Sequence, residues 1–265
     1  RAPGAMGRGA GGDAVTHTVE QVLRGDARWC VVEGDSAEVL RGLPDGSVDA
    51  VITDPPYNDR THAGAKASRG KLSADTTVNF ASLVSTEWYA LALVAARRWC
   101  LAFCAAEQLG EYERAAGDRW IRAGIWIRVG AAPQFTGDRP APGCDAVAIA
   151  HRKGRKRWNG GGRHALWSHG FGATEVGDAR CRPTQKPVRL MLDLVRDFTD
   201  PGEVILDPFA GSGTTGVAAL AEGRRVILVE RDPAYAAIAR ARCEAAATGR
   251  DWRRPEQASL FGGTP

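Results

Sequence analysis

The sequence lacks the features that would mark a membrane, secreted or metal-binding protein. No apolar run in its 265 residues approaches the ~18 residues that a membrane-spanning helix requires. No charged, then apolar, then small-residue signal stands at its start. The six cysteines form no C-x-x-C pair, and no histidine or second cysteine pair stands near Cys100 and Cys104. We therefore expect buried thiols in a cytoplasmic protein, with no metal site and no disulfide framework.

Charge is modest, and it is unevenly distributed. The net charge of +4 is mildly basic, which is compatible with a nucleic-acid partner but weak evidence for one. The stretch HRKGRKRWNGGGR (151–163) carries six Lys or Arg and no acid. The length suits one α/β domain.

Strand-like and helix-like patterns alternate along the chain. Strands are expected at 29–35, 49–54, 101–105, 122–130, 144–152, 202–208 and 224–230. Helices are expected at 36–43, 87–99, 107–117, 186–198, 214–223 and 233–247. The strands at 122–130 and 144–152 suggest a hairpin, and the basic, Gly-rich segment to about residue 180 an irregular structure. The alternation predicts a mainly parallel sheet covered on both faces.

The strand at 49–54 ends in the stiff, polar sequence DPPYND. Two prolines fix the backbone there and remove N–H donors. A rigid turn that ends a strand would explain this pattern without any catalytic role.

A glycine-rich loop, LDPFAGSGTTG (206–216), joins a predicted strand to a predicted helix. Gly211, Gly213 and Gly216 match G-x-G-x-x-G, and Glu230 ends the next strand 19 residues after Gly211. Glycines let the backbone approach a ligand, and an acid at the second strand can accept hydrogen bonds from ribose hydroxyls. A tight turn with small packing residues is the structural alternative.

The loop is compatible with either a dinucleotide or another adenosine cofactor. Asp207, just before the glycines of this loop, can bind an ammonium group but would repel a pyrophosphate. About 50 residues follow the loop, too few to complete a nucleotide-binding sheet, so earlier strands must contribute. Both features disfavour NAD, although an NAD-linked oxidoreductase stays an alternative.

TDPPYND and LDPFAGSGTT together resemble the S-adenosylmethionine-dependent DNA amino-methyltransferases of the N6-adenine/N4-cytosine family. Their order, with RPTQKP (182–187) ahead of the cofactor half, resembles the circularly permuted β class. The resemblance covers roughly residues 29 to 245. It implies a Rossmann-like methyltransferase fold, an α/β structure whose mostly parallel seven-stranded sheet has helices on both faces. The methyltransferase domain would span 15–248.

The resemblance implies that the tip holds a flipped-out base. The Asp54 carboxylate and the Pro55 carbonyl would accept the two N–H bonds of the exocyclic amine, Pro56 would stiffen the tip, and Tyr57 would stack on the base. Catalysis would then be mostly positioning and local electrostatics.

The resemblance also implies a set of contacts to S-adenosylmethionine, without any metal ion. Glu230 would hold the ribose hydroxyls, Arg231 would lie along the adenine, and Asp35 would meet the adenine amine or cap the helix that follows it. Thr184 and Lys186 would meet the cofactor carboxylate. The residues at the methionine end would be Asp207, Phe209, Gly211, Ser212, Gly213, Thr214 and Thr215.

The target base is predicted from the first residue of the tip. Asp at this position is usual in adenine-N6 enzymes of the family and Ser in cytosine-N4 enzymes, so adenine-N6 transfer is expected and cytosine-N4 transfer is the alternative. Cytosine-C5 chemistry would need a Pro-Cys nucleophile, and the sequence has no such dipeptide. A catalytically silent DNA-binding module with the same fold is a further alternative.

The remaining segments predict partners. A small region at about 151–182, with Trp158 or Trp167 stacking or wedging, is expected to contact double-stranded DNA, and the loop at 58–80 is a second candidate. Residues 1–14 are expected to be disordered, and 249–265 to form a flexible tail. In that tail, Gln257–Phe261 resembles the peptide that docks bacterial proteins on the replication sliding clamp. The alternative is that this peptide packs on its own domain. A homodimer would supply recognition that so small a region lacks.

Overall fold

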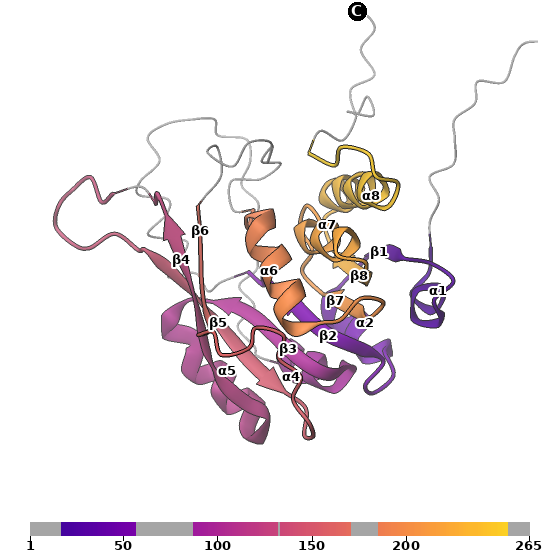
Figure 1. Ribbon diagram of the computed structural model, residues 1–265, viewed down its shortest axis with the longest axis horizontal. Coiled ribbons are helices and arrows are strands. Elements are labelled where there is room, and N and C mark those ends of the chain that lie inside the picture. The colour runs from indigo at the N-terminus through magenta and orange to yellow at the C-terminus, as the bar shows by residue number, and fades with distance from the viewer. Residues whose placement is uncertain (1–16, 57–86, 132, 171–184, 254–265) are drawn as a thin grey trace, which may run out of the picture.

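A computed structural model describes residues 17–56, 87–131, 133–170 and 185–253 (Figure 1). Its strands are β1 (Trp29–Glu33), β2 (Val48–Thr53), β3 (Ala96–Cys104), β4 (Trp120–Val129), β5 (Cys144–His151), β6 (Leu166–Gly170), β7 (Val204–Asp207) and β8 (Arg225–Glu230). Its α-helices are α1 (Val19–Arg24), α2 (Ser36–Gly42), α4 (Glu87–Ala95), α5 (Leu109–Ala116), α6 (Val188–Phe198), α7 (Thr214–Ala221) and α8 (Pro233–Ala247). Two short 3₁₀ helices, η1 (Ala106–Gln108) and η2 (Gly117–Arg119), flank α5.

All strands of the described chain join one sheet in the order β1-β8-β7-β2-β3-β5-β4-β6. The first five are mutually parallel, β5 is antiparallel to both β3 and β4, and β6 is parallel to β4. The mainly parallel sheet and the β4–β5 hairpin are therefore confirmed. The sheet has eight strands, so the expected seven was one too few.

The additional strand is β6, which lies in the segment expected to be irregular. Its sequence is short and carries no alternating apolar pattern. Contacts with α6 hold this strand in place. The Trp167 side chain is 3% exposed, and its indole Nε1 donates to Asp197 Oδ2 of α6 at 3.1 Å. Tertiary packing thus overrides a weak local preference.

The helix expected at 87–99 is also shorter than the pattern suggests. It ends at Ala95, and the chain continues directly into β3. Ala96 and Trp99 pair with Val48 and Ala50 of β2, so these residues complete the centre of the sheet. α1, which the sequence pattern did not predict, begins with a capping box between Thr18 and Gln21.

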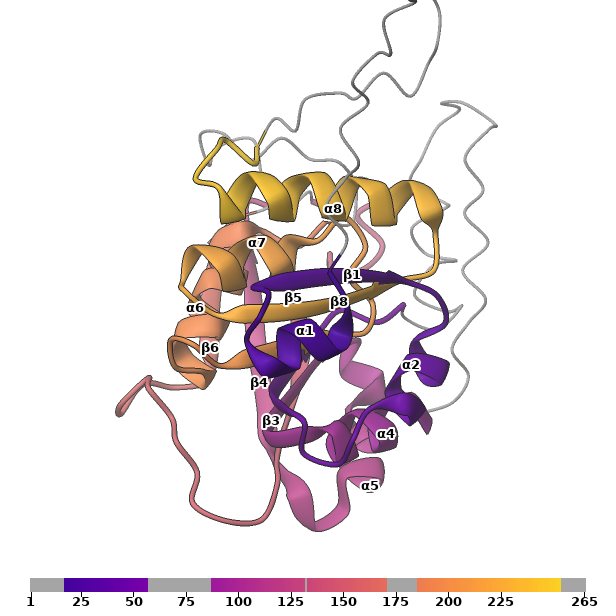
Figure 2. The same cartoon turned by 90° about the vertical axis from the view of Figure 1, so that its right-hand side faces the viewer.

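Helices cover both faces of the sheet, as expected. Figures 1 and 2 show α6, α7 and α8 on one face and α2, α4 and α5 on the other. The first face buries residues such as Leu194, Phe198 and Ala239, and the second buries Trp88 and Tyr112. No helix of the described chain has an apolar stretch long enough to cross a bilayer.

Strand direction separates the two edges of the sheet. The carboxyl ends of β1, β2, β3, β7 and β8 share one edge, where ligands bind in open α/β sheets. The antiparallel β5 ends at the opposite edge, where His151 pairs with Trp99. β6, parallel to β4, then returns toward the first edge. The chain's permutation relative to other methyltransferases stays a prediction.

Candidate active site

The two sequence motifs meet at the carboxyl edge of the sheet. β2 and β7 are parallel neighbours, with Val51 opposite Leu206. Just beyond this pair, the Thr53 hydroxyl donates to Asp207 Oδ1 at 2.6 Å. The proline-rich tip and the glycine loop therefore start side by side, although their strands are far apart in sequence.

Asp207 is the buried centre of this junction, with a side chain that is 2% exposed. It accepts hydrogen bonds from Thr53 Oγ1, from Thr215 Oγ1 at 2.5 Å and from the backbone N–H of Phe209 at 3.0 Å. Burial raises the pKa of Asp207 to about 6 from an ordinary 3.8, and these three bonds act against the rise. The carboxylate thus ties the tip, the loop and the first turn of α7 together, while its contact with a cofactor stays a prediction.

The glycine loop forms a cradle closed by Glu230. Gly211 and Gly213 adopt left-handed φ angles of 54° and 81°. The backbone N–H of Gly211 donates to Glu230 Oε2 at 2.7 Å, and that of Asp232 donates to Oε1 at 2.9 Å. Each carboxylate oxygen therefore accepts one bond and keeps a further lone pair. Glu230 is only half-buried, so the residues present fit a ligand with neighbouring hydroxyls, as a ribose has.

Gly213 is required by packing. A Cβ atom at this position would lie 2.9 Å from the Cβ of Ala239 and 3.0 Å from its Cα, both on α8. The close approach that forbids a side chain is therefore between the loop and α8. The sequence indicated only that the loop glycines let the backbone approach a ligand, and a backbone contact of Gly213 with the cofactor stays a prediction.

Ser212 joins the loop to two elements that the sequence pattern did not connect with it. Its hydroxyl donates to Gln185 Oε1 at 3.1 Å, just ahead of α6. The Arg242 guanidinium of α8, which is 1% exposed, donates to the Ser212 carbonyl at 2.8 Å. An arginine in an Ala-rich helix gives no signal of such a role. Together the two contacts fix the loop from both sides.

Asp54 forms an ion pair that was not expected. Lys186 Nζ lies 2.7 Å from Asp54 Oδ1, with side-chain exposures of 9% and 30%. The ammonium also lies 4.9 Å from the ring centroid of Phe103 and 5.7 Å from that of Trp126. Lys186 was predicted to meet the cofactor carboxylate; here its partner is the carboxylate of the tip.

The other predicted residues lie at the same edge in separate environments. Asp35 caps α2, accepting from the N–H groups of Ala37 and Glu38 at 2.9 and 3.2 Å. Phe209 is half-buried and meets Trp88 edge to face at 4.9 Å. The remaining placed residues are the buried Pro55, the half-buried Pro56, the exposed Arg231 and the buried Thr214. Tyr57, Thr184, the loop 58–80, residues 1–14 and Gln257–Phe261 lie outside the described residues.

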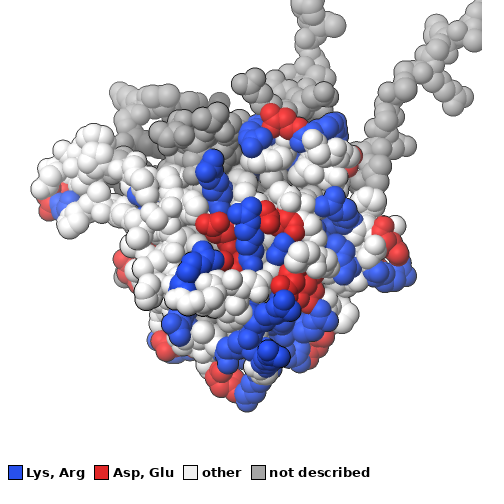
Figure 3. Space-filling view, viewed as in Figure 1, with Lys and Arg blue, Asp and Glu red and all other residues white. Residues whose placement is uncertain are grey.

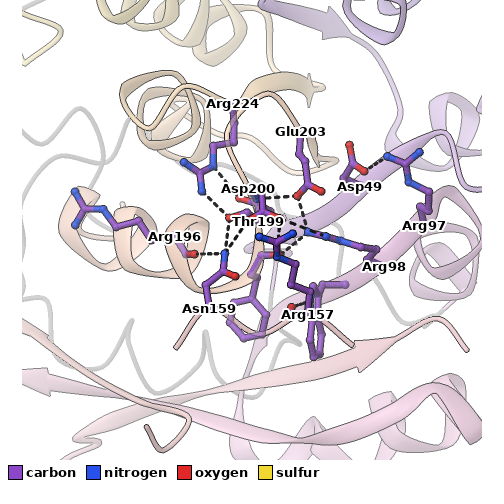
Figure 4. Close-up of polar contacts among 12 residues, drawn as sticks. Asp49, Arg97, Arg98, Arg157, Asn159, Arg196, Thr199, Asp200, Glu203 and Arg224 are labelled. Carbon is purple, nitrogen blue, oxygen red and sulfur yellow. Dashed lines mark hydrogen bonds and ion pairs between the residues drawn. The ribbon is translucent and has the colours of Figure 1, made fainter. Parts of the chain in front are cut away.

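The basic segment 151–163 lies at the opposite edge of the sheet, against the end of α6. Asn159 donates to the carbonyls of Arg196 and Thr199 at 3.0 and 2.9 Å, which caps α6 (Figure 4). Trp158 packs on Phe198 with ring centroids 4.9 Å apart. The segment is thus part of the folded domain.

Most of its charges are paired there. Arg157 lies 3.0 Å from Asp200, which also pairs with Arg98 of β3 (Figure 4). Arg163 pairs with Asp197, Arg152 with Asp45 and Lys153 with Asp118. On the face shown in Figure 3, Lys and Arg are interspersed with Asp and Glu. The buried Trp167 is not placed to stack on a base. DNA contact by 151–182 stays a prediction, and its residues 171–182 lie outside the described chain.

No group of three or more His, Cys, Asp or Glu in the described ranges is arranged to hold a metal ion. Five described cysteines are free thiols; four of them are buried, as expected, and Cys144 is exposed.

Comparisons with known proteins agree with this architecture. The family model described as DNA methylase matches residues 115–241. The chain is similar to the putative methylase YubD of Escherichia coli (strain K12), with 30% identity over 239 residues, 86% of this chain and 98% of that protein. Two solved structures share its fold. The M1.HpyAVI–SAM complex gives a TM-score of 0.59 at 22% identity, covering 80% of this chain and 98% of that one. The cytosine-N4-specific PvuII DNA methyltransferase gives 0.62 at 16% identity, covering 88% of each chain.

The sheet and its helices have the Rossmann-like methyltransferase fold, as the sequence predicted. More specifically, the chain belongs to the DNA methylase family of S-adenosylmethionine-dependent N6/N4 amino-methyltransferases.

Proposed function

We propose that the protein transfers a methyl group from S-adenosylmethionine to the exocyclic N6 of an adenine flipped out of double-stranded DNA. The observation that carries the proposal is the Thr53–Asp207 hydrogen bond. It joins the origin of the base-binding tip to the origin of the cofactor loop, so a methyl can pass directly between their ligands. An NAD-linked oxidoreductase would explain only the glycine loop, and a silent DNA-binding module would explain only the proline-rich tip.

The tip acts by positioning a poor nucleophile. The lone pair of an exocyclic amine is delocalised into the ring, so the nitrogen must pyramidalise toward the methyl. In this proposal, Asp54 and the Pro55 carbonyl accept the two N–H bonds, and Tyr57 stacks on the base. Positive charge moves to the amine during transfer, and an adjacent carboxylate stabilises it. Proton loss follows transfer, so Asp54 need not be a strong base.

The cofactor supplies an activated methyl on a sulfonium. When the cofactor is bound, Glu230 would accept hydrogen bonds from the ribose hydroxyls with its remaining lone pairs. Asp35 would accept a hydrogen bond from the adenine amine. Arg231 would lie along the adenine, and Thr184 and the loop residues would hold the methionine end. Asp207 would hold the loop in place by accepting hydrogen bonds from Thr215 and from the backbone N–H of Phe209.

Adenine is favoured by Asp54 as the first residue of the tip. The second candidate is cytosine-N4 transfer, because the PvuII enzyme with the same fold is cytosine-N4-specific. Both bases present a planar exocyclic amine, and the tip can hold either.

Further partners complete the proposal. Of the predicted DNA-contact region 151–182, residues 171–182 would contact the duplex together with the loop 58–80. The Gln257–Phe261 peptide would dock on a sliding clamp in the bacterial cytoplasm. Deleting 257–261 should abolish binding to purified clamp, and unchanged binding would reject the docking. A homodimer stays a prediction that sedimentation can test.

The test is to incubate the protein with labelled S-adenosylmethionine and mixed-sequence duplex DNA, then digest the product to nucleosides for mass spectrometry. N6-methyladenine supports the proposal, and N4-methylcytosine supports the alternative. If neither forms while S-adenosylmethionine raises the unfolding temperature, the proposed substrate is wrong. A rise with NAD instead would refute the cofactor.

A further inference from the structure

We propose that Lys186 is a positioning residue for Asp54: its ammonium holds one carboxylate oxygen so that the other faces the amine of the base. The inference rests on the function proposed above and refines it. Its starting point is the 2.7 Å ion pair between Lys186 Nζ and Asp54 Oδ1.

Asp54 needs such a partner because of where it lies. It follows the last residue of β2, and its side chain is 30% exposed. The terminal torsion of an aspartate is broad, so an unheld carboxylate samples many orientations. An ammonium at Oδ1 removes this freedom and leaves Oδ2 to accept from the substrate. The carboxylate is then already aligned before the base binds, so its conformational entropy is not lost during the reaction.

Lys186 is itself held firmly enough for this role. Its side chain is 9% exposed, and its ammonium lies near the faces of Phe103 and Trp126. Such cation–π contacts favour the charged form and limit its movement. Pro187, the N-cap of α6, follows directly and restricts the backbone.

A second carboxylate, that of Asp145 on β5, interacts electrostatically with Lys186. Asp145 lies close enough for Lys186 to oppose the rise in its pKa that burial causes, and it pairs with Arg128 at 3.0 Å. Lys186 thus interacts electrostatically with two acids, and its ion pair with Asp54 brings Nζ to 2.7 Å from Oδ1.

The neighbouring residue extends the effect to the cofactor side. Gln185 Oε1 accepts from the Ser212 hydroxyl of the glycine loop. Gln185 therefore contacts the glycine loop, and the next residue, Lys186, contacts the tip, the two elements between which the methyl would pass. A shift in the loop would be transmitted to the tip through this dipeptide.

The positioning role and the predicted cofactor-carboxylate role give different kinetics. A ligand of the cofactor affects the cofactor Kd, whereas a residue that aligns Asp54 affects kcat once cofactor is saturating. In Lys186→Met we expect kcat to fall about 100-fold while the cofactor Kd stays within about threefold. Lys186→Arg should recover most of the loss, since a guanidinium can donate to the same oxygen.

The experiment measures kcat with saturating S-adenosylmethionine and Kd by titration for wild type, both Lys186 variants and Asp54→Asn. Lys186→Met in the Asp54→Asn background should cost little more in kcat, because the group that it aligns has changed. A Kd raised more than tenfold with kcat unchanged would overturn the inference. So would equal losses from Lys186→Met in both backgrounds.

A second readout does not need methylation. The effect of Lys186→Met on the urea midpoint should be smaller in Asp54→Asn than in wild type, because the two side chains interact. Equal effects would reject the contact. An inactive wild-type enzyme with clear coupling would refute the proposed function and leave the Lys186–Asp54 contact standing.

Discussion

Thr53 and Asp207 are 154 residues apart in the chain, yet the hydroxyl of one donates to the carboxylate of the other at 2.6 Å. The bond exists because β2 and β7 are parallel neighbours that end at the same edge. It places a buried carboxylate under the junction of the two functional motifs. Removal of the Thr53–Asp207 hydrogen bond should therefore affect both the proline-rich tip and the glycine loop.

The first prediction concerns this bond. Thr53→Val keeps the side-chain shape but removes a donor to a fully buried carboxylate. Loss of one partner from a buried group costs about 1–3 kcal/mol, so we expect the free energy of unfolding at pH 7.5 to fall by about that amount. Urea unfolding measures it. At pH 4, where Asp207 is protonated, the loss should be smaller; an equal loss at both pH values would contradict this account.

The second prediction concerns pH. The pKa of Asp207 is raised to about 6 in the folded protein from an ordinary 3.8. The folded state therefore holds its proton to higher pH than the unfolded state, and the contribution of Asp207 to stability declines as pH rises from about 4 to about 6. The size of this contribution is at most about 3 kcal/mol.

Asp207→Asn should remove that dependence. We expect the difference in unfolding free energy between wild type and variant to change across pH 4 to 6 and to be constant above it. Asp251→Asn, at an exposed position, is the control. A difference that stays flat from pH 4 to 8 would show that Asp207 titrates near its ordinary value.

The third prediction concerns the tip. Asp54→Ala should abolish methyl transfer while the cofactor affinity stays within several-fold, because Asp54 contacts Lys186 and makes no described hydrogen bond to the glycine loop. Product formation and cofactor titration measure the two effects. Full activity in this variant would refute the proposed mechanism.

The fourth prediction separates packing from backbone strain at Gly213. Gly213→Ala should destabilise the protein by about 1–3 kcal/mol, because its Cβ would press on Ala239. Gly223 has a similar left-handed φ of 74°, but nothing lies within 4 Å of its Cβ position. Gly223→Ala is thus the matched control and should lose about 1 kcal/mol. Equal losses in chemical denaturation would show that strain alone requires glycine at 213.

The fifth prediction concerns the basic segment. Arg155 and Lys156 are exposed and follow β5 at the edge opposite the tips. Replacing both by Ala should leave the KM for DNA and its salt dependence unchanged. If they contact phosphates, the slope of log K against log salt should fall by about 2. That result would show that DNA also reaches the far edge.

The sequence by itself determined most of the elements. Short continuous apolar runs located β1, β2, β7 and β8, and period-3.6 patterns located the helices after Gln185, because local conformation follows the pattern of apolar side chains. The motifs at Asp54 and Gly211 were also local, since each needs only a strand end and a few residues of fixed backbone. Their joint presence indicated the family before any contact was known.

The tertiary structure alone decided which side chains meet. The ion pair of Lys186 with Asp54, the hydrogen bond from Thr53 to Asp207 and the approach of Ala239 to Gly213 each join segments distant in the chain, and no periodicity of the sequence indicates them. β6 likewise depends on distant partners, since it pairs with β4 and its Trp167 donates to Asp197 of α6. The position of the basic segment at the edge opposite the tip also follows only from the direction of β5, while its contact with DNA stays a prediction. Periodicity is a property of neighbours along the chain, whereas a contact depends on strand order and packing, which the whole chain determines together.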